Sequence, residues 1–142
     1  MKRKFFLIMA LVLPLMFVSC GDDDEPGSGI NGTWEMAATD GIYQGALQFT
    51  FKGNSVTYYE YWLEDGKVDD SNTYKGTYSV DEENETITMD LHYYYPNGER
   101  DDTYPETWIF NYSLENRELT LWAVSRDARD FFGSSAYTFK KK

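Results

Sequence analysis

The stretches Leu47-Gln48-Phe49-Thr50-Phe51 and Ile87-Thr88-Met89-Asp90-Leu91 decide the fold class of this chain. In both stretches apolar residues alternate with polar ones. This period of two is typical of a β-strand with one packed face and one solvated face. The same period recurs at Trp108-Ile109-Phe110 and at Leu119-Thr120-Leu121. The sequence therefore predicts an antiparallel, all-β protein.

Working outward from these stretches, segments rich in β-branched and aromatic residues lie between clusters of turn-forming residues. We expect eight short strands with no helix between them, at residues 33–39, 45–51, 55–63, 73–80, 85–93, 106–113, 118–125 and 135–140. Consecutive antiparallel strands of this number suit a closed up-and-down β-barrel, because closure removes the exposed sheet edges that promote aggregation.

The expected connections alternate in length. Residues 52–54, 81–84 and 114–117 are short, whereas the connections at 40–44, 64–72, 94–105 and 126–134 are mostly longer. Alternate hairpins of an up-and-down barrel emerge at the same end, so the longer loops gather at one rim. Such a rim can form the mouth of a binding site, or the loops can be tolerated insertions.

The first nineteen residues have the pattern of a secretory signal. Met1-Lys2-Arg3-Lys4 is basic, and the apolar run from Phe5 to Val18 is shorter than the roughly 20 residues needed to span a bilayer. The run stops at Ser19, before Cys20. This is the only cysteine, so it has no partner in the chain for a disulfide. The alternatives are a single membrane anchor or a secreted protein with a free thiol.

The residues Phe17-Val18-Ser19-Cys20 resemble the lipobox of bacterial lipoproteins, with Phe17 in place of the usual leucine. The resemblance implies that residues 1–19 are removed and that Cys20 carries acyl chains such as palmitate, which anchor the protein in a membrane. Gly21-Asp22-Asp23-Asp24-Glu25 is similar to the acidic export tag of Bacteroidetes lipoproteins. It implies an outer-membrane protein exposed on the cell surface.

The expected mature chain is strongly acidic. Cleavage removes three of the 13 basic residues and none of the 24 acidic ones, leaving 10 against 24 and a net charge of −14. Outside Lys140-Lys141-Lys142 no basic stripe is visible, so we expect no nucleic-acid partner. Residues 20–29 form an expected tether of Gly, Asp, Pro and Ser, and residues 30–142 are long enough for one domain.

The opening of that domain, Asn31-Gly32-Thr33-Trp34, resembles the Gly-x-Trp motif of lipocalins. The later Trp-Ile-Phe, Leu-Thr-Leu-Trp and Tyr-Thr-Phe-Lys segments are similar to the lipocalin-like domains of Bacteroidetes lipoproteins. The resemblance implies a lipocalin-like barrel in which Trp34 plugs the closed end. The Thr-Asp-Tyr element of many lipocalins is missing, and so is the arginine that covers the tryptophan, for which Lys140 is the substitute candidate.

Few residues point to catalysis or to a metal. His92 is the only histidine, which leaves no histidine cluster for zinc and no second candidate for a nucleophile–histidine pair. The loop at residues 65–70 lacks the spacing of a calcium loop. Glu60, Asp90 and Glu106 lie in expected strands, where two could converge as in a glycosidase. Strand carboxylates are more often solvated, so we expect no enzyme activity and no cofactor.

Aromatic residues are the remaining signal. Tyr58-Tyr59-Glu60-Tyr61-Trp62 places aromatics on both faces of one strand, so some must face water or a ligand. We expect a small apolar or aromatic molecule, or a glycan fragment, to bind at the rim, with candidate residues Tyr43, Trp62, Tyr95, Tyr104, Phe131 and Phe132. The alternative is a barrel filled by its own side chains that docks another surface protein; interior volume distinguishes the two.

Overall fold

The computed structural model describes residues 29–40, 42–100 and 103–142. The expected signal segment (1–19), Cys20 and the tether up to residue 28 lie outside these ranges. The described chain forms eight strands and one short helix: β1 (Gly32–Asp40), β2 (Tyr43–Lys52), β3 (Ser55–Glu64), β4 (Lys67–Asp81), β5 (Thr86–Pro96), β6 (Thr103–Glu115), β7 (Glu118–Ala123), α2 (Arg126–Phe132) and β8 (Ala136–Lys141).

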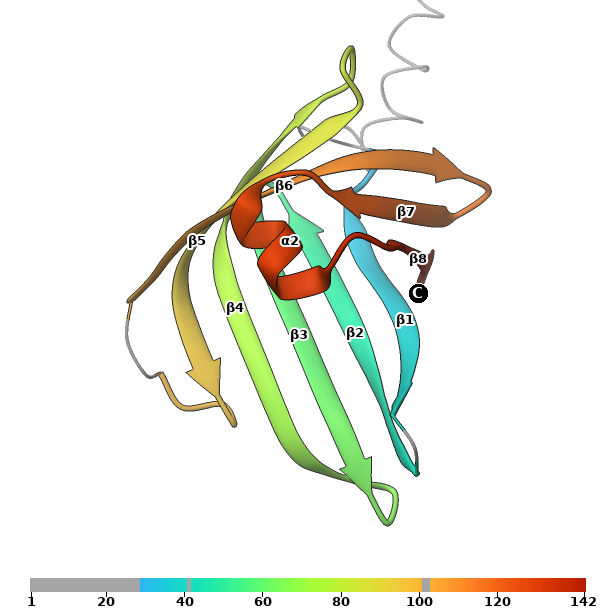
Figure 1. Cartoon of the computed structure of the whole chain (residues 1–142), viewed down its shortest axis with the longest axis vertical. Coiled ribbons are helices and arrows are strands. Elements are labelled where there is room, and N and C mark those ends of the chain that lie inside the picture. Colours follow the sequence, from blue (N-terminus) through green and yellow to red (C-terminus); the bar gives the residue numbers. More distant parts are fainter. Residues whose placement is uncertain (1–28, 41, 101–102) are drawn as a thin grey trace, which may run out of the picture.

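The strands form a closed antiparallel barrel in which each strand pairs with the next and β8 returns to β1. The predicted eight-stranded up-and-down barrel is therefore confirmed (Figure 1). The turns β1–β2, β3–β4 and β5–β6 lie at one end, which we call the rim. The turns β2–β3, β4–β5 and β6–β7 lie at the other end, which we call the closed end.

The strands at the rim are longer than the sequence pattern predicts. β4 begins at Lys67 rather than at residue 73, and β6 begins at Thr103 rather than at 106. The expected loop at 64–72 is in fact a tight turn at Asp65 and Gly66, whose φ angles of 51° and 75° fit a two-residue hairpin turn. Strand pairing is made by backbone hydrogen bonds, which do not depend on the side chain. Polar residues such as Ser71 and Asn72 therefore belong to β4 although the sequence has no apolar alternation there.

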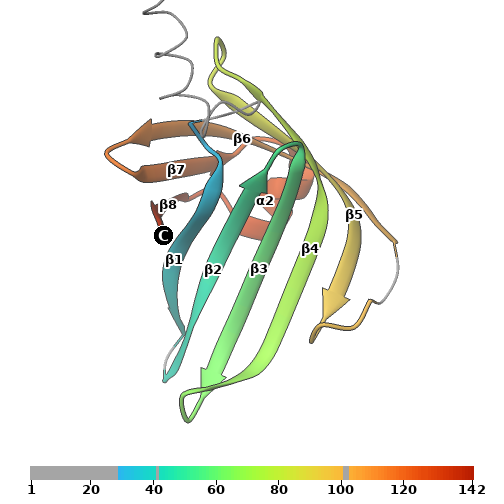
Figure 2. The same ribbon diagram turned by 180° about the vertical axis from the view of Figure 1, so that it is seen from behind.

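The prediction that no helix interrupts the strands is wrong, because α2 replaces the expected loop at 126–134. The Ser125 hydroxyl oxygen accepts the Ala128 N–H at 3.3 Å and caps the helix. The helix ends at Gly133, whose φ of 80° suits glycine and whose N–H donates to the Arg129 carbonyl. α2 lies against β6 and β7 and reaches into the barrel (Figures 1 and 2).

The closed end is sealed by Trp34, which is 1% exposed and whose indole N–H donates to the Ile30 carbonyl at 2.7 Å. The Lys141 ammonium lies 5.5 Å from the centre of the Trp34 ring, within the range of a cation–π contact. Lys141 thus takes the covering position for which the sequence suggested Lys140. Lys140 pairs in the ladder with Glu35 on one side and Glu118 on the other.

The barrel wall is uneven in height. β1 pairs with β8 only at Trp34–Lys141 and Glu35–Lys140, and then continues to the rim without β8 beside it. β7 and β8 are six residues each, whereas β2 to β5 have ten or more. Figure 1 shows these long strands extending past α2 toward the rim, while β7 and β8 stay near the closed end. The described residues contain no helix that is long and apolar enough to cross a membrane.

Candidate functional site

The interior of the barrel is filled at the closed end. Its core is largely aromatic, with the side chains of Trp34, Phe49, Phe51, Tyr58, Trp108, Phe110 and Phe139 almost fully buried. Phe132 of α2 enters this core, with its ring centre 5.4 Å from that of Tyr58 and 5.0 Å from that of Trp108. This half of the barrel is therefore packed by its own side chains, and a ligand inside the barrel has to bind nearer the rim.

Toward the rim, the same inner face becomes polar. Tyr58 faces the core and pairs in the ladder with Phe49 and Tyr74. Strand residues two apart share a face, so the next inner positions on β3 are Glu60 and then Trp62. Glu60 pairs with Leu47 and Asn72, and Trp62 pairs with Gly45 and Asp70. The inner wall thus passes from aromatic core to a mixed aromatic and carboxylate surface.

Glu60 anchors a polar row at this transition. Its carboxylate accepts the Tyr58 hydroxyl at 3.0 Å and the Asn72 side-chain N–H at 3.2 Å. The Asn72 side-chain oxygen in turn accepts a hydrogen bond from the Tyr94 hydroxyl at 2.5 Å. Burial raises the pKa of Tyr58 far above its usual range, and the Glu60 charge raises it further. This tyrosine therefore stays a neutral hydrogen-bond donor.

Tyr74 is the centre of a second aromatic group beside that row. Its ring stacks on Tyr94 at 4.7 Å and contacts Tyr104 at 4.9 Å and Phe131 at 5.4 Å. Burial raises the pKa of Tyr74, and the nearby Tyr94 and Glu60 add to the shift. Tyr104 and Phe131, two of the candidate residues, thus lie together, but they pack on the core rather than on an open surface.

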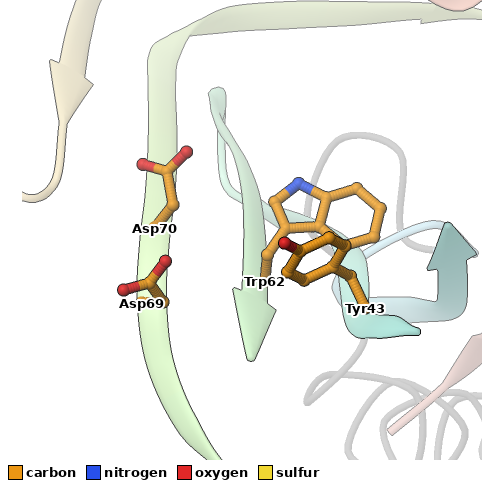
Figure 3. A pocket seen from close by; sticks show the side chains of 4 residues that line it. All are labelled: Tyr43, Trp62, Asp69 and Asp70. Carbon is orange, nitrogen blue, oxygen red and sulfur yellow. The ribbon is translucent and has the colours of Figure 1, made fainter. Parts of the chain in front are cut away.

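A pocket of about 290 Å³ lies closer to the rim, lined by Tyr43, Trp62, Asp69 and Asp70. Figure 3 shows the two aspartates on β4 and the two aromatic rings on the neighbouring strands. The volume is close to the lower limit for small-ligand sites. Two of the six candidate residues, Tyr43 and Trp62, therefore meet at one pocket.

A β-bulge explains how adjacent aspartates reach one pocket. Trp62 pairs with Asp70, but the next residue, Leu63, pairs with Val68, so Asp69 is the extra residue. In a regular strand Asp69 and Asp70 would point to opposite faces. A bulge breaks this alternation and re-aims a side chain, so both carboxylates line the pocket.

Gly45 makes room for the Trp62 indole. A Cβ atom at position 45 would lie 3.0 Å from Cε3 of Trp62 and 2.0 Å from the Tyr61 carbonyl oxygen. Only glycine fits here, because the contact with the Tyr61 carbonyl oxygen is far closer than a real Cβ allows, and the contact with the indole is tight. The ring of Trp62 is therefore seated on the backbone of β2 rather than left free in solvent.

The remaining candidates are placed elsewhere. Phe132 is buried in the core, as described above. Tyr95 pairs with Thr73, on the face opposite to Tyr94, and the Lys75 ammonium lies 5.0 Å from the centre of its ring. Tyr95 is thus on the outer wall and away from the pocket.

The three strand carboxylates do not share one face of the sheet, although Glu60 and Glu106 both lie close enough to Tyr74 to raise its pKa. Asp90 is exposed and accepts the Thr107 hydroxyl at 3.0 Å, whereas Glu60 and Glu106 lie on the inner side. The Glu106 carboxylate accepts the Trp108 indole N–H at 3.0 Å. His92 is exposed, beside Tyr93 and within the β4–β5 register shift. Among the described residues no group of three His, Cys, Asp or Glu side chains is arranged to hold a metal.

Sequence reasoning missed three residues of this wall, namely Asp69, Asp70 and Asn72, because it assigned them to a loop. Continuing the pairing regularly from the turn at Asp65 and Gly66 would have placed Ser71 opposite Glu60, because the bulge at Asp69 shifts the register by one residue. No sequence signal marked the bulge at Asp69.

Two further pockets lie elsewhere on the barrel. One of about 300 Å³ at the closed end is lined by Glu85, Tyr112, Ser113, Leu114 and Glu115. One of about 360 Å³ lies at the β3–β4 tip and is lined by Glu64, Asp65, Lys67, Val68 and Asp69. No protein-family model and no curated protein matches this chain.

Proposed function

We propose that this protein is a lipoprotein of the outer cell surface, anchored through acyl chains on Cys20, whose lipocalin-like barrel binds a glycan fragment at the rim. The observation that carries the proposal is the pocket lined by Tyr43, Trp62, Asp69 and Asp70. Aromatic rings stack against the apolar faces of sugar rings, and carboxylates accept hydrogen bonds from sugar hydroxyls.

The chemistry of the pocket favours a glycan over a purely apolar molecule. An apolar ligand would displace water from Asp69 and Asp70 without replacing its hydrogen bonds, which costs free energy for each carboxylate. The apolar part of the barrel, where such a ligand would be most stable, is occupied by Phe132 and the surrounding core.

The direction of β1 supports an accessible site. β1 begins at the closed end with Gly32 and runs to the rim, so the chain that precedes it leaves from the end opposite the pocket. An anchor at Cys20 would then hold the closed end toward the membrane and present the rim to the surroundings.

Binding rather than catalysis fits the carboxylates. Asp90 is on the outer face, and Glu60 and Glu106 already accept hydrogen bonds from Tyr58, Asn72 and Trp108. These hydrogen bonds give Glu60 and Glu106 a structural role in the inner wall, which favours binding over acid–base catalysis.

The test is a binding screen of the mature lipoprotein in detergent against a panel of neutral oligosaccharides and fatty acids, followed by tryptophan fluorescence and calorimetry. We expect an oligosaccharide to bind and Trp62→Ala to weaken it by about tenfold or more, equivalent to about 1.4 kcal/mol. Trp122→Ala is the matched control, because Trp122 is 39% exposed on a strand face away from the core. Binding of fatty acids alone, or equal effects of both variants, would contradict the proposal.

A second candidate is a docking module for another surface protein, and the exposed apolar residues at the rim favour it. Ile42 is 90% exposed and Val68 is 54% exposed, both at hairpin tips. Exposed apolar groups of this kind mark interaction surfaces when they gather in a patch. If this candidate is correct, Ile42→Asp with Val68→Asp abolishes capture of a partner by crosslinking in cells and leaves oligosaccharide binding unchanged.

A further inference from the structure

We propose that the rim pocket selects a glycan that carries a free, positively charged amino group, and that Asp70 is the residue that recognises this charge. The inference rests on the proposed glycan-binding function and narrows its ligand class. It starts from the four residues that line the pocket, of which two are aromatic, two are acidic and none is basic.

Neither aspartate takes part in an ion pair with another described residue. The ion pairs among the described residues join Arg126 to Asp130 and Lys142 to Glu35, and neither involves Asp69 or Asp70. Two carboxylates that share one pocket repel each other, and the negative net charge of the chain adds to the repulsion. A ligand with a positive charge relieves this repulsion, whereas a neutral ligand leaves it in place.

The aromatic walls act in the same direction. A cation near the face of tryptophan or tyrosine is attracted by the negative potential of the ring, and tryptophan gives the strongest attraction. Trp62 is held in place over Gly45, so its ring is already positioned before a ligand arrives. Tyr43 is 52% exposed, so part of its ring is open to a ligand. Aromatic rings with adjacent carboxylates therefore suit an ammonium group better than a hydroxyl group.

Asp70 and Asp69 are not equivalent. Asp69 also lines the neighbouring pocket at the β3–β4 tip, where Lys67 is one of the lining residues. Asp69 thus shares a pocket with a basic residue, although no ion pair among the described residues joins the two side chains. Asp70 does not line that second pocket and pairs directly across the ladder with Trp62. Asp70 is therefore the carboxylate available to a ligand that stacks on the indole.

The ligand must also suit a site open to solvent. An anionic sugar, such as a uronic or sialic acid, would meet two carboxylates of the same charge sign and is disfavoured. A neutral sugar stacks on the rings but gains nothing from the aspartates beyond hydrogen bonds. An amino sugar combines the stacking face with the charge, so it satisfies all four lining residues.

The experiment compares two probes with the same sugar ring, the glucosamine disaccharide and its fully N-acetylated form, on the mature lipoprotein at mildly acidic pH, where the free amine is protonated. We expect the amine to bind about tenfold or more tightly at low salt, and this advantage to shrink as salt screens the charges. Asp70→Asn should reduce the amine to the affinity of the acetylated probe without weakening the latter. Asp69→Asn should have a smaller effect, and Trp62→Ala should weaken both probes.

The outcomes separate this inference from the proposed function. Equal binding of the two probes, sensitive to Trp62→Ala, overturns the charge selection and leaves glycan binding standing. Amine binding that Asp70→Asn does not change assigns the charge recognition elsewhere and overturns the inference. If neither probe binds, the inference is overturned, and the oligosaccharide panel alone decides the proposed function. Circular dichroism of Asp70→Asn and Asp69→Asn verifies that each variant is folded.

Discussion

At the scale of single residues, buried hydroxyls tie the aromatic core to the polar inner wall. Tyr58 is almost fully buried, and its hydroxyl finds an acceptor in Glu60 at 3.0 Å. Tyr78 is also buried and donates to the Asn31 side-chain oxygen at 3.1 Å. A buried hydroxyl without a partner costs about 1–3 kcal/mol, so these acceptors allow tyrosine to serve as a core residue. The edge of the aromatic core is therefore formed by tyrosine hydroxyls that are hydrogen-bonded to polar side chains.

Because these tyrosines are buried in their neutral form, the free energy of unfolding should decrease at alkaline pH. Burial is the first cause of the raised pKa of Tyr58, Tyr74, Tyr78, Tyr104 and Tyr112. In the unfolded chain tyrosine ionises near pH ~10, whereas the folded chain holds these protons to higher pH. The stabilisation is therefore fully present below about pH 10 and is lost above it, because only the unfolded state releases the protons.

The measurement is tyrosinate absorbance against pH, with circular dichroism of the same samples. Of the 12 tyrosines in the chain, these five should ionise at higher pH than free tyrosine, and Tyr58, which is 1% exposed, should ionise only as the barrel unfolds. Simultaneous titration of all tyrosines near pH ~10 in a barrel that stays folded would refute this interpretation.

At the scale of elements, α2 decides how much of the barrel is empty. The helix is seven residues long, too short to be stable by itself in water. It is held by Ala128 and Phe132, both buried, and by the Tyr137 hydroxyl, which donates to the Phe132 carbonyl at 2.6 Å. Tertiary contacts thus stabilise the helix, and the helix in turn fills the core.

Ser125 is the polar residue that joins α2 to the wall. Its hydroxyl oxygen accepts the Ala128 N–H and the Ile109 N–H, the latter at 2.9 Å, and its hydroxyl donates to the Thr107 carbonyl at 3.1 Å. Ser125→Ala removes the helix cap and leaves two strand groups without this partner. We expect a loss of about 1–2 kcal/mol in the free energy of unfolding, measured in urea.

Ser79→Ala on β4 is the control for this variant, because Ser79 is an exposed serine on a strand. It should change stability by less than about 0.5 kcal/mol. If the two variants are equally stable, the cap contributes nothing to the docking of α2.

At the scale of the whole molecule, the unequal strands give the barrel a direction. The closed end holds Trp34 and the beginning of β1, and the rim holds the pocket and the exposed Ile42, Tyr43 and Val68. With an anchor at Cys20, the two ends differ in their access to reagents outside the cell.

This difference can be measured by placing one thiol at each end of the barrel. Val68→Cys introduces a thiol at the rim, and Glu83→Cys introduces one in the β4–β5 turn at the closed end; both native residues are exposed. In intact cells a membrane-impermeant maleimide should label the rim variant several-fold faster if the proposed anchor holds the closed end toward the membrane. In detergent extracts the two rates should converge. Equal rates in cells would contradict the orientation, and labelling that requires broken cells would contradict surface display.

The sequence by itself determined the architecture. Alternation in Leu47–Phe51 and Ile87–Leu91 selects strands, because a period of two places every second side chain on one face whatever the neighbours are. The number of strands and their order follow from turn residues between such stretches. The buried position of Trp34 was also predicted, from a resemblance.

Only the tertiary structure decided where the site lies. Whether Tyr95 or Tyr94 faces inward depends on the register between β4 and β5, which shifts at Gly76, where a Cβ would lie 2.0 Å from the Asp90 carbonyl oxygen. The bulge that brings Asp69 and Asp70 into one pocket is equally a matter of pairing. The sequence predicted Phe131 and Phe132 to lie at the rim. In the structure the helix α2 places both side chains against the core. The local pattern determines that successive side chains point to opposite faces of the sheet. Pairing across the barrel determines which of these side chains point inward.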